Sequence, residues 1–332
     1  MNRHPERKAP DFFAQIKLKG YLKLAETILN QTIIMLILIM VGVFCFKAKL
    51  ISRESNKDLS KLVLQVVNPA MIFMSYQTEY KASLVKNLLL TFALSVGTFV
   101  VMTILAYFLI QKKQDRETEI ERFSSIYSNC GFMGIPLLNA LFGMEGVFYL
   151  TAYITVFNLI VWTHGIILIS GERDMKKVIK VFYSPTVISI VLGIICFFFE
   201  LKLPDVPSKA LEFVAQLNTP LAMIVSGVTM AETDVLKMLK NKRVYIVCLI
   251  RLIIIPFILS AGLSFLPMNE KVRMTVVVAA SAPPAAMCTL QCIRYGRNSV
   301  YASQIFTAGT VLSVATLPMI VRFTEYLTNL FD

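Results

Sequence analysis

The sequence Ser128-Asn129-Cys130-Gly131-Phe132-Met133-Gly134-Ile135-Pro136 lies inside an otherwise apolar segment that is long enough to cross a membrane. In a helix interior, glycine costs roughly 1 kcal/mol and proline roughly 3 kcal/mol, so this stretch predicts a broken helix. Backbone groups freed by a break find no water in hydrocarbon, and a break is therefore tolerated only inside protein or beside a cavity. We expect residues 130–136 to interrupt a membrane helix at a buried place.

A second interruption of the same kind lies toward the other end of the chain. Ser281-Ala282-Pro283-Pro284-Ala285 falls inside another apolar segment, and neither proline can donate a helical hydrogen bond. Paired interruptions in corresponding segments are the best indication of a transporter's binding site that a sequence offers. We therefore expect a substrate to be held where two broken helices cross.

The composition indicates a helical membrane protein that crosses the bilayer many times. Hydrophobic residues make up 56% of the chain and charged residues only 16%, which is far from a soluble balance. The apolar runs are about 20 residues long, as membrane helices require. The net charge of +12 could indicate nucleic-acid binding. The basic residues are, however, spread over short loops, as membrane insertion requires, and we expect no nucleic-acid partner.

Motifs for enzymatic chemistry are missing from the sequence. It contains no HExxH, no GxSxG and no P-loop, so we expect no catalytic residues and no enzyme activity. The six cysteines form no CxxC pair, and we expect them to be small buried hydrophobic residues. We accordingly expect neither a metal site nor a cofactor.

Ten apolar spans can be placed along the chain, with short loops between them. Alternate loops carry the basic residues, and the positive-inside rule places these loops in the cytoplasm and both termini outside it. Residues 1–27 form an N-terminal extension, which we expect to contain an interfacial helix. The predicted spans cover residues 28–46, 59–76, 84–110, 122–142 (broken), 146–170, 184–200, 210–230, 244–266, 274–293 (broken) and 300–322.

Two landmarks indicate an internal repeat. Asn68-Pro69-Ala70-Met71-Ile72 resembles Thr219-Pro220-Leu221-Ala222-Met223-Ile224, with the prolines 220 − 69 = 151 positions apart. Pro136 and Pro283 are 283 − 136 = 147 positions apart, although a chance coincidence of prolines could also give two similar offsets. Five spans in each half is an odd number, so the halves (28–171 and 184–332, joined by a cytoplasmic linker at 172–183) would insert with opposite topology.

These motifs resemble the auxin efflux carrier family, which includes bacterial malate permeases and the plant PIN carriers. The run Asn129–Pro136 carries the resemblance most specifically, and Trp162-Thr163-His164-Gly165 and Ala282-Pro283-Pro284 support it. The resemblance implies ten helices in two inverted five-helix repeats, with helices four and nine crossing at their broken centres. It also implies an elevator-like motion, organic-anion substrates and a homodimer. Plant members have an acidic residue near the start of the third helix, where this chain has Ala82 and Ser83.

The expected site combines the two breaks with nearby polar side chains. The N-terminal end of a half-helix carries free N–H groups and a partial positive charge, and two such ends can hold a carboxylate. By match to the family motif, Asn129 is the side chain expected to contact the substrate; alternatively, it satisfies backbone groups of the break. The expected substrate-binding residues are Asn129, Cys130, Gly131, Gly134, Pro136, Ala282, Pro283, Pro284, Asn68, Asn218 and Gln291.

Arg251 lies roughly two turns inside the eighth predicted span. Its side chain is expected to extend toward the lipid headgroups; alternatively, it contacts the anion or forms part of a gate. No acidic residue lies at the centre of a predicted span, which argues against a cation/proton antiporter, because such exchange needs buried carboxylates.

We therefore expect a secondary transporter in the plasma or inner membrane. It would move a small carboxylate-bearing organic anion, auxin-like or malate-like, by alternating access, surrounded by membrane lipid. An anion channel and a non-transporting membrane sensor remain alternatives, because broken helices also occur in pores and in proteins that only bind.

Overall fold

The computed structural model describes residues 12–112, 117–171, 183–233 and 235–331. Within these ranges the fold is all helical, as predicted, and the extended pairing is limited to a single isolated bridge between Ser128 and Pro284. Residues 12–27 of the expected N-terminal extension are helical and continue without interruption into the first span, as the start of α1 (Phe12–Lys47), whereas residues 1–11 and nearly all of the expected linker at 172–183 lie outside the described residues.

The helices follow the apolar runs of the sequence, but several runs contain more than one element. Among the described residues, three short π-helical segments, η1, η3 and η4, interrupt otherwise continuous helices, and a fourth, η2, begins the helix that continues as α6. The elements are α1 (Phe12–Lys47), α2 (Arg53–Leu62), η1 (Val63–Val67), α3 (Asn68–Ser75), α4 (Ala82–Leu109), α5 (Thr118–Ile126), η2 (Cys130–Gly134), α6 (Ile135–Ile160), η3 (Val161–Gly165), α7 (Ile166–Ser170), α9 (Pro185–Phe198), α10 (Asp205–Gln216), α11 (Asn218–Ala231), α12 (Val235–Lys240), α13 (Lys242–Leu249), η4 (Ile250–Ile254), α14 (Ile255–Ser264), α15 (Glu270–Ser281), α16 (Met287–Arg294) and α17 (Ser299–Phe331).

Six stretches of the described chain are long and apolar enough to cross a membrane. They are Glu26–Lys47, Ala82–Leu109, Cys130–Ser170, Asp205–Ala231, Lys242–Ser264 and Ser299–Leu330. The stretch Cys130–Ser170 is divided at Gly143, whose backbone angles (φ 62°, ψ −151°) are not helical. The other predicted spans consist of shorter or interrupted helices: α2 with η1 and α3, α9, α5, and α15 with α16.

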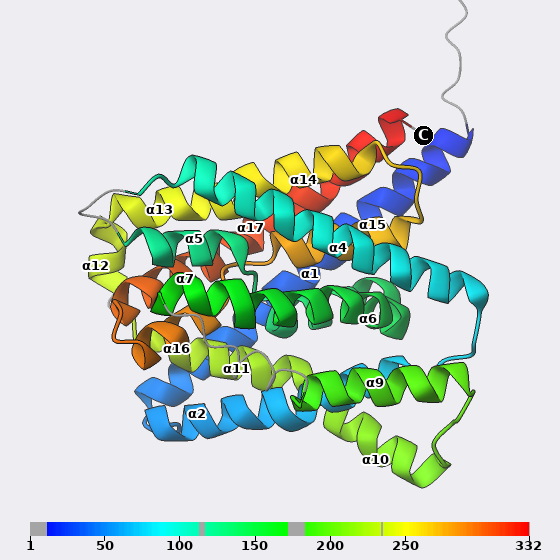
Figure 1. The fold of residues 1–332 in the computed structure, drawn as a ribbon, viewed down its shortest axis with the longest axis horizontal. Coiled ribbons are helices and arrows are strands. Elements are labelled where there is room, and N and C mark those ends of the chain that lie inside the picture. Colours follow the sequence, from blue (N-terminus) through cyan, green and yellow to red (C-terminus); the bar gives the residue numbers. More distant parts are fainter. Residues whose placement is uncertain (1–11, 113–116, 172–182, 234, 332) are drawn as a thin grey trace, which may run out of the picture.

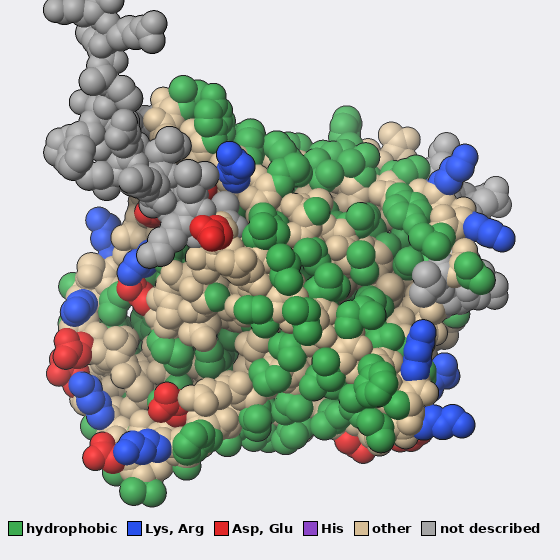
Figure 2. Space-filling model, turned by 180° about the vertical axis from the view of Figure 1, so that it is seen from behind, with side chains coloured by type: hydrophobic (Ala, Val, Ile, Leu, Met, Phe, Trp, Pro, Cys, Tyr) green, Lys and Arg blue, Asp and Glu red, His purple; other side chains and the backbone are tan. Residues whose placement is uncertain are grey.

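The surface has the distribution of side chains that a lipid environment requires. Figure 2 shows hydrophobic side chains over the middle of one face, with Lys, Arg, Asp and Glu gathered toward its two ends. Large apolar side chains such as Ile37 on α1, Phe108 on α4 and Phe198 on α9 are more than half exposed. Together with the six apolar helices, this surface identifies a multi-pass membrane protein.

The helices pack in layers that α1 connects. Figure 1 shows α2, α9 and α10 along one side, α4, α13 and α14 along the other, and α5, α6 and α7 between them. Helix α1 contacts α11, α17 and α6. Its close approach to α11 depends on two glycines. A Cβ added to Gly42 of α1 would lie 2.2 Å from the carbonyl oxygen of Ile224 in α11, and a Cβ added to Gly227 of α11 would lie 2.0 Å from the carbonyl oxygen of Ile39 in α1.

Candidate functional site

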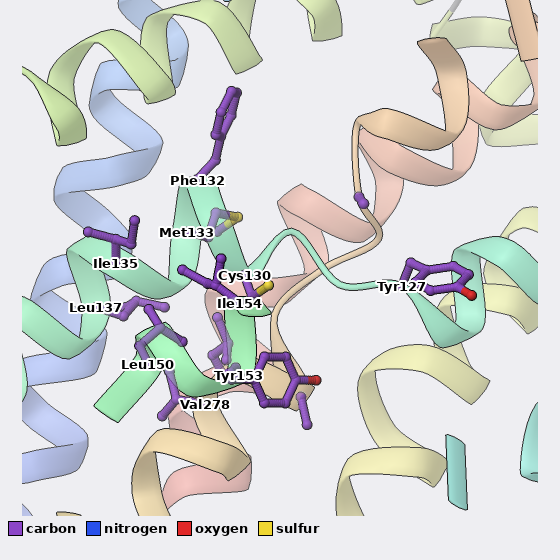
Figure 3. Packing of buried hydrophobic residues seen from close by; sticks show 14 of the residues in the cluster. Tyr127, Cys130, Phe132, Met133, Ile135, Leu137, Leu150, Tyr153, Ile154 and Val278 are labelled. Atoms are coloured by element: carbon purple, nitrogen blue, oxygen red, sulfur yellow. The ribbon is translucent and has the colours of Figure 1, made fainter. Parts of the chain in front are cut away.

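Two interrupted helices cross and pair through their backbones near the centre of the fold. Helix α5 ends at Ile126 and the next helical turn begins at Cys130, while α15 ends at Ser281 and α16 begins at Met287. The extended segments between them run antiparallel. The N–H of Asn129 donates to the carbonyl of Pro283 at 2.7 Å, and the N–H of Ala285 donates to that of Tyr127 at 3.0 Å. We call residues 127–129 and 282–286, which meet in this way, the crossing (Figure 3).

The first break lies earlier in the chain than the sequence predicted. The expected interruption was 130–136, but residues 130–134 form η2, and Pro136 is the second residue of α6. Pro136 thus lies just after η2, and local π-helical turns of this kind are one way in which a membrane helix accommodates a proline. The second break, by contrast, contains Pro283 and Pro284 as predicted.

Buried polar groups without protein partners gather beside the crossing. Asn129 is 7% exposed, and its side-chain Nδ2 has no hydrogen-bond partner among the described residues. The hydroxyls of Ser125 and Ser128, next to the first break, and of Ser281, next to the second, are likewise buried and unpartnered there. Since buried polar groups are almost always satisfied, such a group of them is suited to a polar ligand or to ordered water.

A pair of asparagines lies close to the helix that follows the first break. The Nδ2 of Asn218, at the start of α11, donates a short hydrogen bond to Oδ1 of Asn68, at the start of α3. A Cβ added to Gly131 would lie 4.0 Å from Nδ2 of Asn68, which is ordinary contact distance, so this glycine lies beside the pair. A Cβ at Gly134 would meet only ordinary contacts with Leu150 and Cys130.

The remaining predicted residues differ in their relation to the crossing. Cys130 is fully buried in η2, and Ala282 is the C-cap of α15. Pro284 pairs with Ser128 and packs against α17, where a Cβ at Gly309 would lie 2.5 Å from Cδ of Pro284. Gln291 is buried in α16, and its Oε1 has no partner in the described part of the chain.

Arg251 is fully buried in η4, so the expectation that it extends to the headgroups is wrong. Its Nε and Nη2 donate to the carbonyl of Ala282 at 3.2 and 2.9 Å, and its Nη1 donates to the carbonyl of Ser125 at 3.1 Å. Nη1 also lies 3.4 Å from Sδ of Met102 on α4. One guanidinium therefore contacts both broken helices. Position along a span did not reveal this, because it does not say which way a side chain faces.

Sequence reasoning also missed an ion pair, formed on a buried carboxylate, that joins three helices. Glu121 in α5 is 1% exposed and accepts two hydrogen bonds from Arg243 of α13, at 2.7 and 2.6 Å. The hydroxyl of Tyr301 in α17 donates to the same carboxylate at 2.9 Å. Each residue lies near the end of a span, so the sequence offered no sign that these residues meet.

Tyr127 fixes one end of the crossing through its side chain as well as its backbone. Its hydroxyl lies 2.8 Å from Nδ1 of His164 in η3 and 3.2 Å from the carbonyl oxygen of Ile160. Figure 3 shows Tyr127 at the end of α5, separated from the cluster around Cys130 by the extended segment.

A polar cavity of about 260 Å³ lies between the start of α4, the start of α15 and the part of α6 that follows Gly143. None of the predicted site residues lines it. Its walls include Lys81, Ser83, Asn87, Glu145 and Tyr149. The carboxylate beside the start of α4 thus comes from Glu145, which accepts from Tyr149 at 3.0 Å and pairs with Lys271 of α15.

Comparison with known proteins gives a consistent result. A family model described as "Membrane transport protein" matches residues 27–321. An "Uncharacterized transporter" of Methanothermobacter thermautotrophicus is 24% identical over 301 residues, covering 89% of this chain and 96% of that protein. An uncharacterized transporter of Methanocaldococcus jannaschii is 26% identical, with 79% and 87% covered. A protein of Rhizobium meliloti named "Putative malonate transporter" is 24% identical, with 80% and 85% covered.

Proposed function

This chain belongs to the membrane transport protein family, the auxin efflux carrier family that its motifs resemble, and we propose that it is a secondary carrier for a carboxylate-bearing organic anion. The observation that carries the proposal is the backbone pairing of the two breaks, beside which the amide Nδ2 of Asn129 is buried with no partner in the described part of the chain. Each break exposes the N-terminal end of one helix, at Cys130 and at Met287. Free N–H groups at such ends attract a carboxylate without a buried lysine.

The proposed site has two parts that face each other. Asn129, Cys130, Gly131 and the second break supply backbone and amide donors, and the Asn68–Asn218 pair faces Gly131 from α3 and α11. A carboxylate seated at the crossing would accept hydrogen bonds from Nδ2 of Asn129 and from free N–H groups of the helix ends. Gln291 and Pro136 would belong to the surroundings of this site.

Ten membrane crossings in two inverted repeats remain our proposal for the topology. Two contacts between positions separated by nearly the same interval support it. Asn68 bonds Asn218, 218 − 68 = 150 positions away, and Met102 contacts Arg251, 251 − 102 = 149 positions away. Both intervals fall between the 147 and 151 positions that separate the paired prolines, and residues related by a two-fold axis meet in this way when they lie close to it.

We place the carrier in the plasma or inner membrane, with both termini outside the cytoplasm. Transport would follow alternating access by an elevator-like motion, in which the part that carries the crossing moves against α1, α3 and α11. The protein would function as a homodimer, as the family resemblance implies.

The substrate would be a small organic acid. The Rhizobium meliloti relative carries malonate in its name, and malonate is therefore the first compound to test. Purified protein would be screened by thermal shift against monocarboxylates and dicarboxylates, because a ligand that binds the folded state raises the unfolding midpoint. Compounds that bind would then be tested for counterflow in liposomes.

Asn129→Ala is the variant that tests the site. We expect it to insert and fold, to lose the ligand-induced thermal shift and to lose counterflow. The matched control is Asn56→Ala, because Asn56 is also buried but bonds Val225 and Thr229 of α11 and touches neither break. Wild-type counterflow in the Asn129→Ala protein would refute the site. If the wild-type protein passes the anion but shows no counterflow, it is a channel. If it binds the anion but does not move it, it is a sensor.

A further inference from the structure

Arg251 has an arrangement that a buried charge rarely adopts. The side chain is fully buried, and in the described part of the chain no carboxylate forms an ion pair with it. A buried charge without an opposite charge is costly, particularly inside a membrane. Its partners are instead two backbone carbonyls and one thioether. The positive charge of the guanidinium must therefore be compensated by groups other than a carboxylate.

The two carbonyls are those that the breaks leave free. In an uninterrupted helix, the carbonyl of Ser125 would accept from the N–H of Asn129, but that N–H donates to Pro283 across the crossing. The carbonyl of Ala282 lies directly after α15, beyond which the chain is extended. Arg251 thus supplies the donors that these carbonyls lost when the helices were broken.

The charges at the crossing balance when the helix dipoles are included. Helices α5 and α15 both direct their C-terminal ends at the guanidinium, and each such end carries a partial negative charge of about half a unit. Two ends together match the single positive charge of Arg251. The two N-terminal ends, at Cys130 and Met287, carry about half a positive unit each, which leaves about one positive charge for a bound anion.

We propose that Arg251 is the built-in cation of the crossing. It holds the C-terminal ends of the two broken helices together, in the place between carbonyl oxygens where a metal cation could otherwise bind. It thereby positions the N-terminal ends for one carboxylate. Arg251 is a positioning residue, because its donors are directed at backbone carbonyls. The inference rests on the proposed carrier function and adds that turnover requires no metal cation.

The first experiment compares the wild type with Arg251→Ala in liposomes that contain the full chain. Counterflow of radiolabelled malonate would be measured with sodium, potassium or choline as the sole cation. We expect the wild type to be equally active in all three. Arg251→Ala should lose malonate binding and counterflow by roughly 10- to 100-fold, a usual range for coupling between sites. Methylguanidinium should restore part of this loss by entering the space that the side chain left.

Arg273→Ala is the matched control. Arg273 is also buried, and its guanidinium also donates to carbonyls, those of Leu263 and Leu266, but it contacts neither break. We expect this variant to be less stable while its malonate affinity stays within about twofold of wild type, because distant sites are usually independent. An equal loss of affinity in both variants would reduce Arg251 to a general structural role and overturn the proposal.

Other outcomes separate this inference from the carrier proposal. A wild type that needs sodium, or an Arg251→Ala protein with full counterflow in choline, would overturn the inference and leave the carrier intact. A wild type that moves no carboxylate would refute the carrier. Even then, the position of Arg251 between the two carbonyls could be tested by thermal unfolding. If methylguanidinium raises the unfolding midpoint of Arg251→Ala but not that of the wild type, that position is supported. If it raises neither midpoint, that position is refuted.

Discussion

Substitution of Gly309 by alanine tests whether α17 presses directly on the crossing. The added Cβ would lie 2.5 Å from Cδ and 3.0 Å from Cγ of Pro284, and both distances are shorter than the ordinary contact range of 3.4–4 Å. Both atoms belong to a proline ring in the backbone, so the ring cannot swing away and the segment must move. Overpacking of this kind costs about 1–3 kcal/mol.

The cost would be larger if the crossing itself opened. Pro284 lies between Pro283, which accepts from Asn129, and Ala285, which donates to Tyr127. Loss of both hydrogen bonds would add about 2 kcal/mol, at about 1 kcal/mol each. We therefore expect Gly309→Ala to lower both the free energy of unfolding and malonate counterflow.

The control is Gly262→Ala in α14, where no atom of the described residues lies within 4 Å of the added Cβ. Both substitutions bring the same gain in helix propensity, about 0.5–1 kcal/mol, so their difference isolates the clash. Unfolding in mixed detergent micelles would measure it. Equal stability of the two variants would refute the claim that α17 supports the crossing.

Two further predictions concern pairs of polar residues. Glu121→Gln should destabilise the fold by about 2 kcal/mol, because Arg243, which is partly exposed, and Tyr301 lose the carboxylate that they bind. Lys61→Ala, which removes an exposed ion pair, should change stability by less than about 1 kcal/mol. Similar unfolding curves for the two variants would contradict the structure. A double-mutant cycle with Asn68→Ala and Asn218→Ala should give a coupling energy of about 1 kcal/mol, and strict additivity of the two changes would show that the pair does not form.

The sequence was informative wherever a residue changes the backbone directly. Pro283 and Pro284 lack an N–H, and the chain is extended at these residues as predicted. The first break could not be located in the same way. It falls at Tyr127, Ser128 and Asn129, none of which disfavours a helix strongly, and the hydrogen bond from Asn129 to Pro283 fixes it there. Contacts between distant segments decided its position, and local propensity did not.

The same limit applies to the charged residues. The length of the apolar run indicated how far along a span Arg251 lies. The groups that its side chain contacts, however, are set by the packing of α4, α5 and α15 around η4. Glu121 directly precedes the predicted span 122–142, yet its burial depends on Arg243 and Tyr301, which lie far away in the sequence. A single sequence does not show which of its helices are neighbours.

The glycine contact between α1 and α11 has a mechanical consequence. A Cβ on Gly227 would lie only 3.0 Å from the Cα of Gly42, so the two helices touch backbone to backbone with no flexible side chains between them. Sliding either helix along the other would bring ordinary side chains into a gap that only glycine fits. The two helices are therefore fixed in their register, and the elevator-like motion proposed above would have to take place along their other faces.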